Sequence, residues 1–442
     1  MDERAYERSH PWIRFRPGLA RATPQLWSLL GQTTARCEQV ARAVLPPAAA
    51  AEMHKLYLIK GARATTAIEG NTLSQEQVRD RLEGQLELPI SQEYLGREVD
   101  NILRACEDIF ERVIAGEPLR LTPDRIREAN RLVLAGLEEH LEEGVVPGEV
   151  PTFSVGVARY SGAPREDCRF LLERLCEWLE EDAAWPDLEE HLGSAVAVAL
   201  LRAILAHLYI AWIHPFGDGN GRTARLAEFL ILARAGVPSP ATHLLSNHYS
   251  LTRADYYRQL DRSSRANGGR GNALGFIVYS LQGFLDGLEE QCRYVEGVQS
   301  WLAWEHYVYW RFRLHPRSPA MNRRREVVLV LGRHAEPARK RDIPDLAPVL
   351  ARLYSTKTAK TLTRDLNWLL ADDPARKGRR RIPRSRPHDA AVPSRSSLAS
   401  RVPKPPAEAF VSSAEGPVPA GSSRTKRICE GCLKNPSPVF RA

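Results

Sequence analysis

The sequence predicts an all-α fold, a bundle of helices with one small β-hairpin. Apolar residues recur at helical spacing through most of the chain. Residues 188–213 are apolar on nearly every side, as a fully buried helix must be. Residues 147–164 break this pattern with apolar residues that alternate with small ones, which is typical of a hairpin. With 442 residues, 43% of them hydrophobic and 26% charged, the chain is expected to form about two or three globular domains.

Helical periodicity continues through the first two thirds of the chain. Pro46 and Pro47 end the first long helix, because proline cannot continue a helix, and Gly70 suits the end of the second. Thr122 and Pro123 are the cap and the first residue of a later helix. The predicted helices of this part cover residues 19–44, 48–70, 97–114, 122–137, 168–181, 188–213, 220–235, 250–260 and 274–288.

The longest apolar run, residues 195–213, approaches the length of a membrane span. Arg202 and His207 interrupt it near the middle, where charged groups in lipid are costly. We therefore expect this helix at the centre of a globular domain, with no membrane as a partner.

The C-terminal part begins with an aromatic connector at residues 301–313. Residues 327–331, 343–353 and 358–370 then resemble a small helix-turn-helix. Within 341–370, the last helix carries hydroxyls and cations that could contact DNA, namely Thr358, Lys360, Thr361, Thr363 and Arg364. A helical cap that binds no nucleic acid is the alternative. The strand residues expected of a wing do not follow Leu370 in the sequence.

The basic charge of the chain comes from its tail. Residues 374–442 carry 15 Lys and Arg against 4 Asp and Glu, a net charge of +11 in a chain whose total is +8. The charge of the whole chain therefore says little about the substrate of the main domain. The tail is rich in Pro, Ser and Ala with few large apolar residues, and we expect it to be disordered.

The seven cysteines are scattered, without the spacing of a disulfide framework, which favours a reducing compartment. Cys429 and Cys432 form one CxxC pair with no second pair or nearby histidine, which indicates zinc only weakly. Residues 1–10 are charged and no apolar segment follows them. We therefore expect no signal peptide and a cytoplasmic location.

Residues 214–225, which read HPFGDGNGRTAR, carry the candidate chemistry. Asp218 is an oxygen ligand with little bulk around it, as Mg²⁺ on a nucleotide phosphate requires. Arg222 and Arg225 lie three residues apart and can face one anion, and His214 has an ordinary pKa near neutrality. Three glycines let successive N–H groups face one concavity at a helix N-terminus, namely Gly217, Gly219 and Gly221. Each part taken singly also fits a turn or a solvated helix face.

The twelve residues together match the signature HPFx[DE]GNGRxxR of the Fic family without a departure, so the chain resembles that family. The resemblance implies a Fic-fold helical bundle and transfer of AMP from Mg-ATP to a protein hydroxyl. It implies that His214 is the general base for the attacking hydroxyl and that Asp218 holds Mg²⁺. It also implies that ATP is bound by Gly217, Gly219, Asn220, Gly221, Arg222 and Arg225.

A second motif lies in residues 64–73, ATTAIEGNTL. Thr65, Glu69 and Gly70 fit the pattern [ST]xxxE[GN], which resembles the inhibitory motif of the family class whose inhibitory helix is N-terminal in the same chain. The resemblance implies that Glu69 reaches the ATP site and pairs with Arg225 in a fork geometry, so that the enzyme is autoinhibited. An ordinary helix end is the alternative.

The resemblance assigns two further regions to the ligands. The hairpin is similar to a flap that holds the target beside the base, with Val157, Ala158, Arg159 and Tyr160 along the nucleotide and the target backbone. Tyr256 of the pair Tyr256-Tyr257 would lie beside the adenine, with core packing as the alternative. Some relatives carry asparagine eight residues after the first tyrosine, where this chain has Ser264.

The resemblance covers roughly residues 10–372 and implies four parts. These are an N-terminal helical region with the inhibitory motif at 65–70 (1–115), the Fic core (116–290), a connector with a winged-helix-like segment (291–373) and the tail (374–442).

Other functions are open on the sequence alone. A Fic-type kinase would transfer the γ-phosphate, but such relatives carry bulkier loop residues than Gly219 and Gly221. Phosphocholine transfer and removal of AMP, with Glu69 positioning water, are further enzyme alternatives. Outside enzymes, the chain would be a DNA-binding regulator with a vestigial nucleotide pocket. The sequence identifies no target beyond a protein with a Ser, Thr or Tyr hydroxyl, and homodimers are common in the resembling class.

Overall fold

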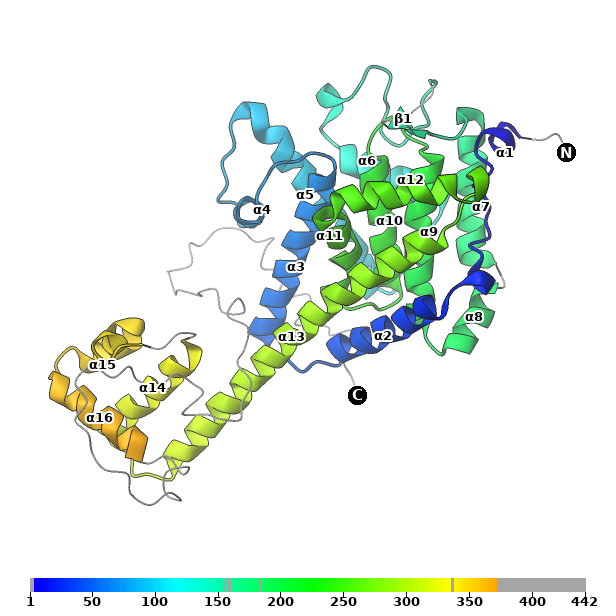
Figure 1. Cartoon of the computed structure of the whole chain (residues 1–442). Helices are drawn as coiled ribbons and strands as arrows, with labels where there is room; N and C mark the ends of the chain where they lie inside the picture. Colours follow the sequence, from blue (N-terminus) through cyan, green and yellow to red (C-terminus); the bar gives the residue numbers. More distant parts are fainter. Residues whose placement is uncertain (1–3, 154–155, 158–159, 183, 335–337, 372–442) are drawn as a thin grey trace. The chain divides into compact units, whose positions relative to one another are not determined.

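The structure is a computed structural model that describes residues 4–153, 156–157, 160–182, 184–334 and 338–371. Helices dominate these residues (Figure 1). Their only strands are β1 (Gly156–Val157) and β2 (Tyr160–Ser161), an antiparallel pair in which Val157 lies opposite Tyr160. The prediction of an all-α fold with one small hairpin is therefore confirmed. The tail at residues 374–442 lies outside the described residues.

The chain divides into two compact units, the first ending at Cys292 and the second beginning at Arg293. No boundary falls near residue 115. There α3 (Pro47–Ile68) and α5 (Glu93–Ile114) of the N-terminal region pack against α10 (Asn220–Arg234) of the core, within one unit.

The central helix of the first unit is α9 (Ala195–Ile213). It packs against α10, α7 (Arg165–Glu181), α8 (Ala184–Leu192) and α2 (Pro24–Ala41). By length and composition α9 could cross a membrane, but most of it is buried within the protein, which accounts for its apolar sequence.

The single helix predicted at residues 188–213 is wrong, because α8 and α9 are separate. Gly193 adopts the left-handed conformation with a φ of 63°. Directly after it, the Ser194 hydroxyl caps α9 by accepting from the Ala197 N–H at 3.3 Å. The break thus falls where a glycine and a capping serine meet.

The N-terminal helices surround this centre, and prolines open several of them. Pro24 opens α2, and Pro47 opens α3. Thr122 caps α6 (Pro123–Leu134), as predicted, by accepting from the Arg125 N–H at 3.2 Å. The other elements of this region are α1 (Ala5–Ser9), η1 (Leu19–Arg21), α4 (Gln75–Leu82), η2 (Ile90–Gln92) and η3 (Glu138–His140).

A close approach at Gly61 holds α3 against the segment of η4 (Ala241–His243) and α11 (Leu244–Leu251). A Cβ at Gly61 would lie 2.2 Å from the His243 ring, so a side chain there would require the joint to open. The body of α3 is therefore fixed by a contact that only glycine permits.

The first unit ends with α12 (Arg253–Gly269) and the beginning of α13 (Leu274–Arg313). The helices predicted at 274–288 and 301–313 are one helix of 40 residues. No proline separates the two segments, so nothing in the chain stops the helix between them.

The second unit contains α14 (Pro319–Arg333), η5 (Lys340–Leu346), α15 (Pro348–Tyr354) and α16 (Ala359–Ala371). Its core includes Val327, Ile343, Leu350, Leu362 and Leu366. Residues 355–358 join α15 to α16, a turn length typical of a helix-turn-helix. The described residues of this unit contain no strand. The wing expected after a helix-turn-helix would fall beyond residue 371, outside the described residues.

Candidate active site

His214 ends α9 and begins the loop. Its N–H still bonds to the Ile210 carbonyl at 2.8 Å, but its backbone adopts the left-handed conformation, with φ 51° and ψ 57°. Among the described residues it is the only non-glycine residue at positive φ. Such strained positions cluster at functional sites, where the fold fixes one side chain.

The His214 ring is half-buried and neutral at pH 7. Burial lowers the pKa of the imidazole below its ordinary 6.5, against the opposing effects of the Ala211 carbonyl, Glu69 and Asp218. A neutral imidazole carries a hydrogen on only one of its two ring nitrogens. The other ring nitrogen keeps its lone pair and can take a proton from a ligand.

Asn220 shapes the loop. Its Oδ1 accepts from the Phe216 N–H at 3.0 Å, and its Nδ2 donates to the Phe216 carbonyl at 2.6 Å. Because the side chain is buried and both of its ends are used, Asn220 holds the loop backbone rather than presenting its amide to a ligand. Gly219, with a φ of 74°, then leads directly into α10.

Asn130 on α6 holds the loop from outside, although no motif marks it. Its Nδ2 donates to the Asp218 carbonyl at 2.9 Å, and its Oδ1 accepts from the Gly148 N–H at 2.7 Å. A Cβ at Gly219 would lie 2.9 Å from the same Nδ2. At Gly217 a Cβ would lie 2.6 Å from Val145, so both loop glycines are required by close packing.

Asp218 is the loop carboxylate most open to solvent, with 45% of its side chain exposed. Its Oδ1 accepts from the Gly219 N–H and lies 3.3 Å from Arg222 Nη2. No group of three or more His, Cys, Asp or Glu side chains that could hold a metal ion exists in the described part of the chain. A cation at Asp218 would therefore need ligands that the protein does not supply, such as phosphate oxygens and water.

The two loop arginines are almost completely buried and have donors to spare. Arg225 Nη2 donates to the Thr65 carbonyl at 3.0 Å and to Glu69. Within the described residues, Arg225 Nε and Nη1 and Arg222 Nε have no hydrogen-bond partner. Buried guanidinium donors without partners are costly, and anionic oxygens are their best acceptors. These orphaned donors fit the phosphates of a nucleotide.

Glu69 follows α3 and covers the loop. Its carboxylate bonds to one nitrogen of Arg225, Nη2, rather than to two in a fork. Burial by itself would raise the pKa of Glu69, but Arg225, Arg222 and His214 outweigh that effect and lower it. A Cβ at Gly221 would lie 2.3 Å from Glu69 Oε1. An ionised carboxylate thus occupies the space over Gly221, at the N-terminus of α10.

The hairpin is anchored beside His214. Tyr160 donates its hydroxyl to the Trp212 carbonyl at 2.5 Å, and the Ala163 N–H bonds to the Ile213 carbonyl at 3.0 Å. A Cβ at Gly162 would lie 2.9 Å from the Cβ of His214, so the turn into α7 also passes close to the histidine. Ala158 and Arg159 and the side chain of Val157 lie outside the described residues.

The tyrosine pair is divided between the core and the surface. Tyr256 is buried, and its hydroxyl lies 2.9 Å from His207 Nε2. In this structure it presents no open edge to an adenine. Tyr257 is 40% exposed, and its hydroxyl lies 3.4 Å from the Ile68 carbonyl, next to Glu69. Ser264 is buried and bonds to the Asp261 carbonyl at 3.0 Å.

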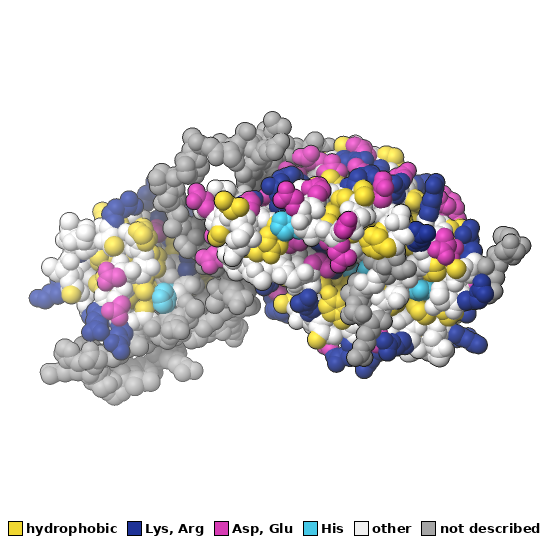
Figure 2. Space-filling model, turned by 90° about the horizontal axis from the view of Figure 1, so that it is seen from above, with side chains coloured by type: hydrophobic (Ala, Val, Ile, Leu, Met, Phe, Trp, Pro, Cys, Tyr) yellow, Lys and Arg dark blue, Asp and Glu magenta, His cyan; other side chains and the backbone are white. Residues whose placement is uncertain are grey.

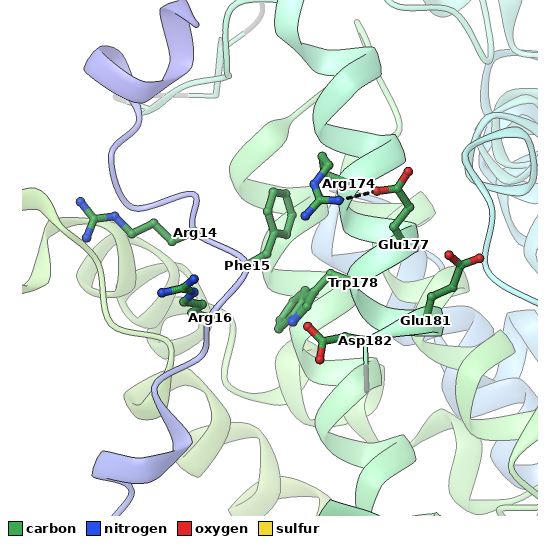
Figure 3. Close-up of a pocket in the computed structure, with 8 residues that line it drawn as sticks. All are labelled: Arg14, Phe15, Arg16, Arg174, Glu177, Trp178, Glu181 and Asp182. Carbon is green, nitrogen blue, oxygen red and sulfur yellow. Dashed lines mark hydrogen bonds and ion pairs between the residues drawn. The ribbon is translucent and has the colours of Figure 1, made fainter. Parts of the chain in front are cut away.

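A hollow of about 610 Å³ lies between the segment around Phe15 and α7, and none of its lining residues belongs to the loop (Figure 3). Phe15 packs against Trp178 with ring centroids 5.9 Å apart, and Arg174 bonds to Glu177 at 2.5 Å. The remaining lining charges have both signs: Arg14, Arg16, Glu181 and Asp182. This mixture favours no particular ligand.

Residues 120–232 match the model of the Fic/DOC family. Protein adenylyltransferase fic-1 of Caenorhabditis elegans is 31% identical over 196 residues, which are 44% of this chain and 34% of the relative. The fic-1 protein of Caenorhabditis briggsae is 32% identical over 197 residues, again 44% of this chain and 34% of the relative. The chain thus spans about a third of the length of these curated relatives.

Solved structures are similar over a larger part of the chain. A Fic family protein from Desulfovibrio desulfuricans G20 is 22% identical with a TM-score of 0.48, over 79% of this chain and 90% of the other. A fragment of Fic-1 from C. elegans is 25% identical with a TM-score of 0.47, over 60% of this chain and 71% of the other.

Proposed function

We propose that this chain, whose residues 120–232 match the model of the Fic/DOC family, transfers AMP from ATP to a hydroxyl side chain of a target protein. The observation that carries the proposal is the neutral His214 at the entry of a loop whose buried arginines have unpartnered donors. A base and an anion site in one loop are what nucleotidyl transfer requires. The naming of the relatives as protein adenylyltransferases supports the same reaction.

In the proposed reaction His214 takes the proton of the attacking hydroxyl. The hydroxyl oxygen forms a bond to the α-phosphorus, and the bond from that phosphorus to the bridging oxygen of the β-phosphate breaks. Pyrophosphate leaves, and AMP stays on the target. Neutral His214 suits this role because one of its ring nitrogens keeps a lone pair.

The loop would hold the phosphates. Arg225 Nε and Nη1 and Arg222 Nε are the unpartnered donors, and the N–H groups at the start of α10 add a partial positive charge. Asp218 would hold Mg²⁺, which neutralises charge on the phosphates and on the leaving group. Asn220 contributes by keeping the loop in shape.

The hairpin lies where it could bind a segment of the target protein. Its anchoring next to His214 through Tyr160 and Ala163 supports a role as the strand against which a target segment pairs. Pairing through the backbone reads no side chains, so the target would be any protein that presents a Ser, Thr or Tyr hydroxyl in an extended segment.

We propose that the described state is autoinhibited by Glu69. Its carboxylate occupies the space over Gly221 and one nitrogen of Arg225, both of which a triphosphate would need. The same carboxylate could position water for the reverse reaction, removal of AMP. We also propose a reducing, cytoplasmic location, which the buried free thiols of Cys37, Cys106, Cys168, Cys176 and Cys292 support.

Label from ATP tests the reaction type. We expect α-labelled ATP with Mg²⁺ to label protein in a cell lysate, and the Glu69→Gly variant to label itself as well. In an assay of the purified chain without lysate, the γ-labelled nucleotide should leave no label on the Glu69→Gly variant, because pyrophosphate departs. Label from the γ-position alone would indicate a kinase and contradict the proposal. Mass spectrometry of the labelled bands would identify the target and the modified residue.

A second function is proposed for the second unit, contact with double-stranded DNA through α16. Residues 293–371 carry 15 Lys and Arg against 7 Asp and Glu, whereas residues 1–292 carry 32 against 41. In the left part of Figure 2, Lys and Arg side chains appear at several points of the second unit. A basic helix-turn-helix unit attached to an acidic one fits binding to a polyanion.

The exposed face of α16 carries polar and basic side chains and, at the two ends of the helix, alanines. Lys360, Arg364 and Asn367 are exposed at helical spacing. The single acid of this helix, Asp365, is turned inward, where it pairs with Arg323 at 3.1 Å and Arg324 at 2.8 Å. Thr363 is engaged elsewhere, because its hydroxyl donates to the Ala359 carbonyl at 2.8 Å.

Salt dependence of binding tests this contact. We expect the full chain to bind a fluorescent DNA duplex, and Lys360→Ala with Arg364→Ala to weaken binding and to lower the slope of log K against log salt by about 2. Arg42→Ala with Arg169→Ala, two exposed arginines outside this unit, removes the same charge as a control. Equal losses in both double variants would show that net charge, not α16, determines binding.

A further inference from the structure

Two residues beyond Glu69, the side chain of Asn71 begins a line of hydrogen bonds to the other loop arginine. Asn71 Nδ2 donates to Glu98 Oε2 at 2.8 Å. The second oxygen of Glu98, Oε1, accepts from Arg222 Nη1 at 2.8 Å. The segment after α3 therefore reaches both arginines of the loop, Arg225 directly through Glu69 and Arg222 indirectly through Glu98.

Glu98 on α5 is the main restraint on Arg222. Only 5% of the Arg222 side chain and 14% of the Glu98 side chain are exposed, so water competes little for this contact. Asp218 gives Arg222 a longer contact at 3.3 Å and is itself open to solvent. The short contact with Glu98 thus determines how the planar guanidinium is turned, and with it the direction of the unpartnered Nε.

Glu98 is an acid close to the proposed phosphate site, where its negative charge opposes anion binding. Burial raises the pKa of Glu98, and the carboxylates of Asp218 and Glu69 add to this, whereas Arg222 and Asn71 lower it. Asn71 therefore helps to keep Glu98 ionised and bonded to Arg222. A positioning role for Glu98 explains the cost.

Asn71 is docked on α5, two residues after Glu69. Besides Glu98, Asn71 Nδ2 donates to the Leu95 carbonyl at 2.9 Å, and its Oδ1 accepts from the Leu73 N–H at 3.0 Å. Gly70 between them has a φ of 108° and open space where a Cβ would lie. The Asn71 N–H bonds to the Thr66 carbonyl at 3.2 Å, so the turn at Gly70 also ties Asn71 to the end of α3.

We propose that Asn71 and Glu98 are positioning residues that hold Arg222 for phosphate binding. This rests on the proposed transfer of AMP. Glu69 and Asn71, two residues apart, then act in opposite directions, the first as inhibitor and the second as support for catalysis.

Kinetics in the Glu69→Gly background test the proposal. We expect Asn71→Ala and Glu98→Ala each to raise KM for Mg-ATP by on the order of tenfold to a hundredfold, because a hydrogen bond to a charged group is lost. Glu98→Gln keeps an oxygen that accepts from Arg222 and should recover most of the loss. The double variant Asn71→Ala with Glu98→Ala should be no worse than Glu98→Ala, because both act through one contact.

Direct binding separates this proposal from the proposed reaction. Calorimetry of Mg-ATP with the Glu69→Gly, His214→Ala chain needs no turnover, and Asn71→Ala should weaken that affinity by the same factor. If Asn71→Ala weakens Mg-ATP binding as expected but no AMP transfer is observed, the proposed reaction is contradicted and the positioning role is retained. Glu180→Ala is the matched control, because it breaks an ion pair of 2.7 Å to Arg234 on the same helix, away from the loop. It should lower the melting temperature without changing KM.

Two results would overturn the proposal. One is an unchanged affinity for Mg-ATP in a folded Glu98→Ala chain. The other is a rise in transfer when Asn71→Ala is made with Glu69 in place, because Asn71 would then belong to the inhibitory contact.

Discussion

Glu69→Gly is expected to raise the initial rate of AMP transfer by on the order of 10²-fold, because a misplacement of about 1 Å in the reacting atoms costs about that much. With Glu69 present, a triphosphate meets a carboxylate over Gly221 and an arginine whose Nη2 is already bonded. Its α-phosphorus is therefore out of line with the attacking hydroxyl. The variant removes both obstacles, and incorporation of α-label measures the result.

Glu69→Gln separates charge from bulk in the same assay. The amide keeps the size of the side chain but pairs with Arg225 more weakly, so we expect a rate between those of the wild type and Glu69→Gly. A Glu69→Gly chain that binds ATP but transfers AMP at the wild-type rate would show that Glu69 is not the inhibitor.

The melting temperature provides an independent readout of the same contact. Without Glu69, the buried Arg225 lacks its counter-ion, which costs about 3–5 kcal/mol of unfolding free energy. A bound triphosphate restores an anion at that position. The shift of melting temperature on adding Mg-ATP should therefore be larger for Glu69→Gly than for the wild type.

The loop could be predicted because its parts are contiguous. Twelve consecutive residues contain His214, the glycines and both arginines, and an apolar run before them predicts the helix that ends at His214. The contact between Glu69 and Arg225 was expected from a second motif, and the structure contains it through one nitrogen instead of a fork. Local sequence specifies the groups present, but the exact pairing depends on how α3 lies on α10.

The residues that orient the loop could not be predicted. Glu98 lies 124 residues from Arg222, and Asn130 lies 88 residues from Asp218. Each belongs to a common residue type in an ordinary amphipathic helix, and only the packing of α5 and α6 on α10 brings them to the loop. For Tyr256 and Tyr257 the sequence cannot tell which one faces inward, because that depends on how α12 is turned about its own axis.

Two features were visible in the sequence and were missed. Gly193 followed by Ser194 is a common signal for the end of one helix and the N-cap of the next. The strong apolar pattern around these two residues obscured it. The change from acidic to basic composition at Arg293 does not show in the summed charge of the residues before the tail, because the charges of the two parts nearly cancel. Formation of a homodimer stays a prediction.

His214→Ala is expected to lower AMP transfer by roughly 10²- to 10⁴-fold in the Glu69→Gly background, with little effect on Mg-ATP binding, because a general base contributes about that factor. The backbone of His214 is left-handed, so His214→Asn is a useful second variant, since asparagine tolerates that conformation better than alanine. His191→Ala, at an exposed histidine on α8, is the control and should leave the rate unchanged. Near-normal transfer by both His214 variants would reject the assignment of the base.

The pH dependence of the rate identifies the same group by its protonation. Transfer requires neutral His214, so the rate should fall as pH decreases through the pKa of the imidazole. Burial lowers that pKa, so the midpoint of this fall should lie below 6.5. Glu69 and Asp218 oppose the shift by favouring the protonated ring, so removing the Glu69 charge in Glu69→Gly should move the midpoint further down, not up.

The profile of kcat/KM between pH 5 and 8 measures this for the free enzyme. A midpoint above 6.5 in Glu69→Gly would show that another group takes the proton. The same would follow if the residual activity of His214→Asn had the pH profile of the chain with His214.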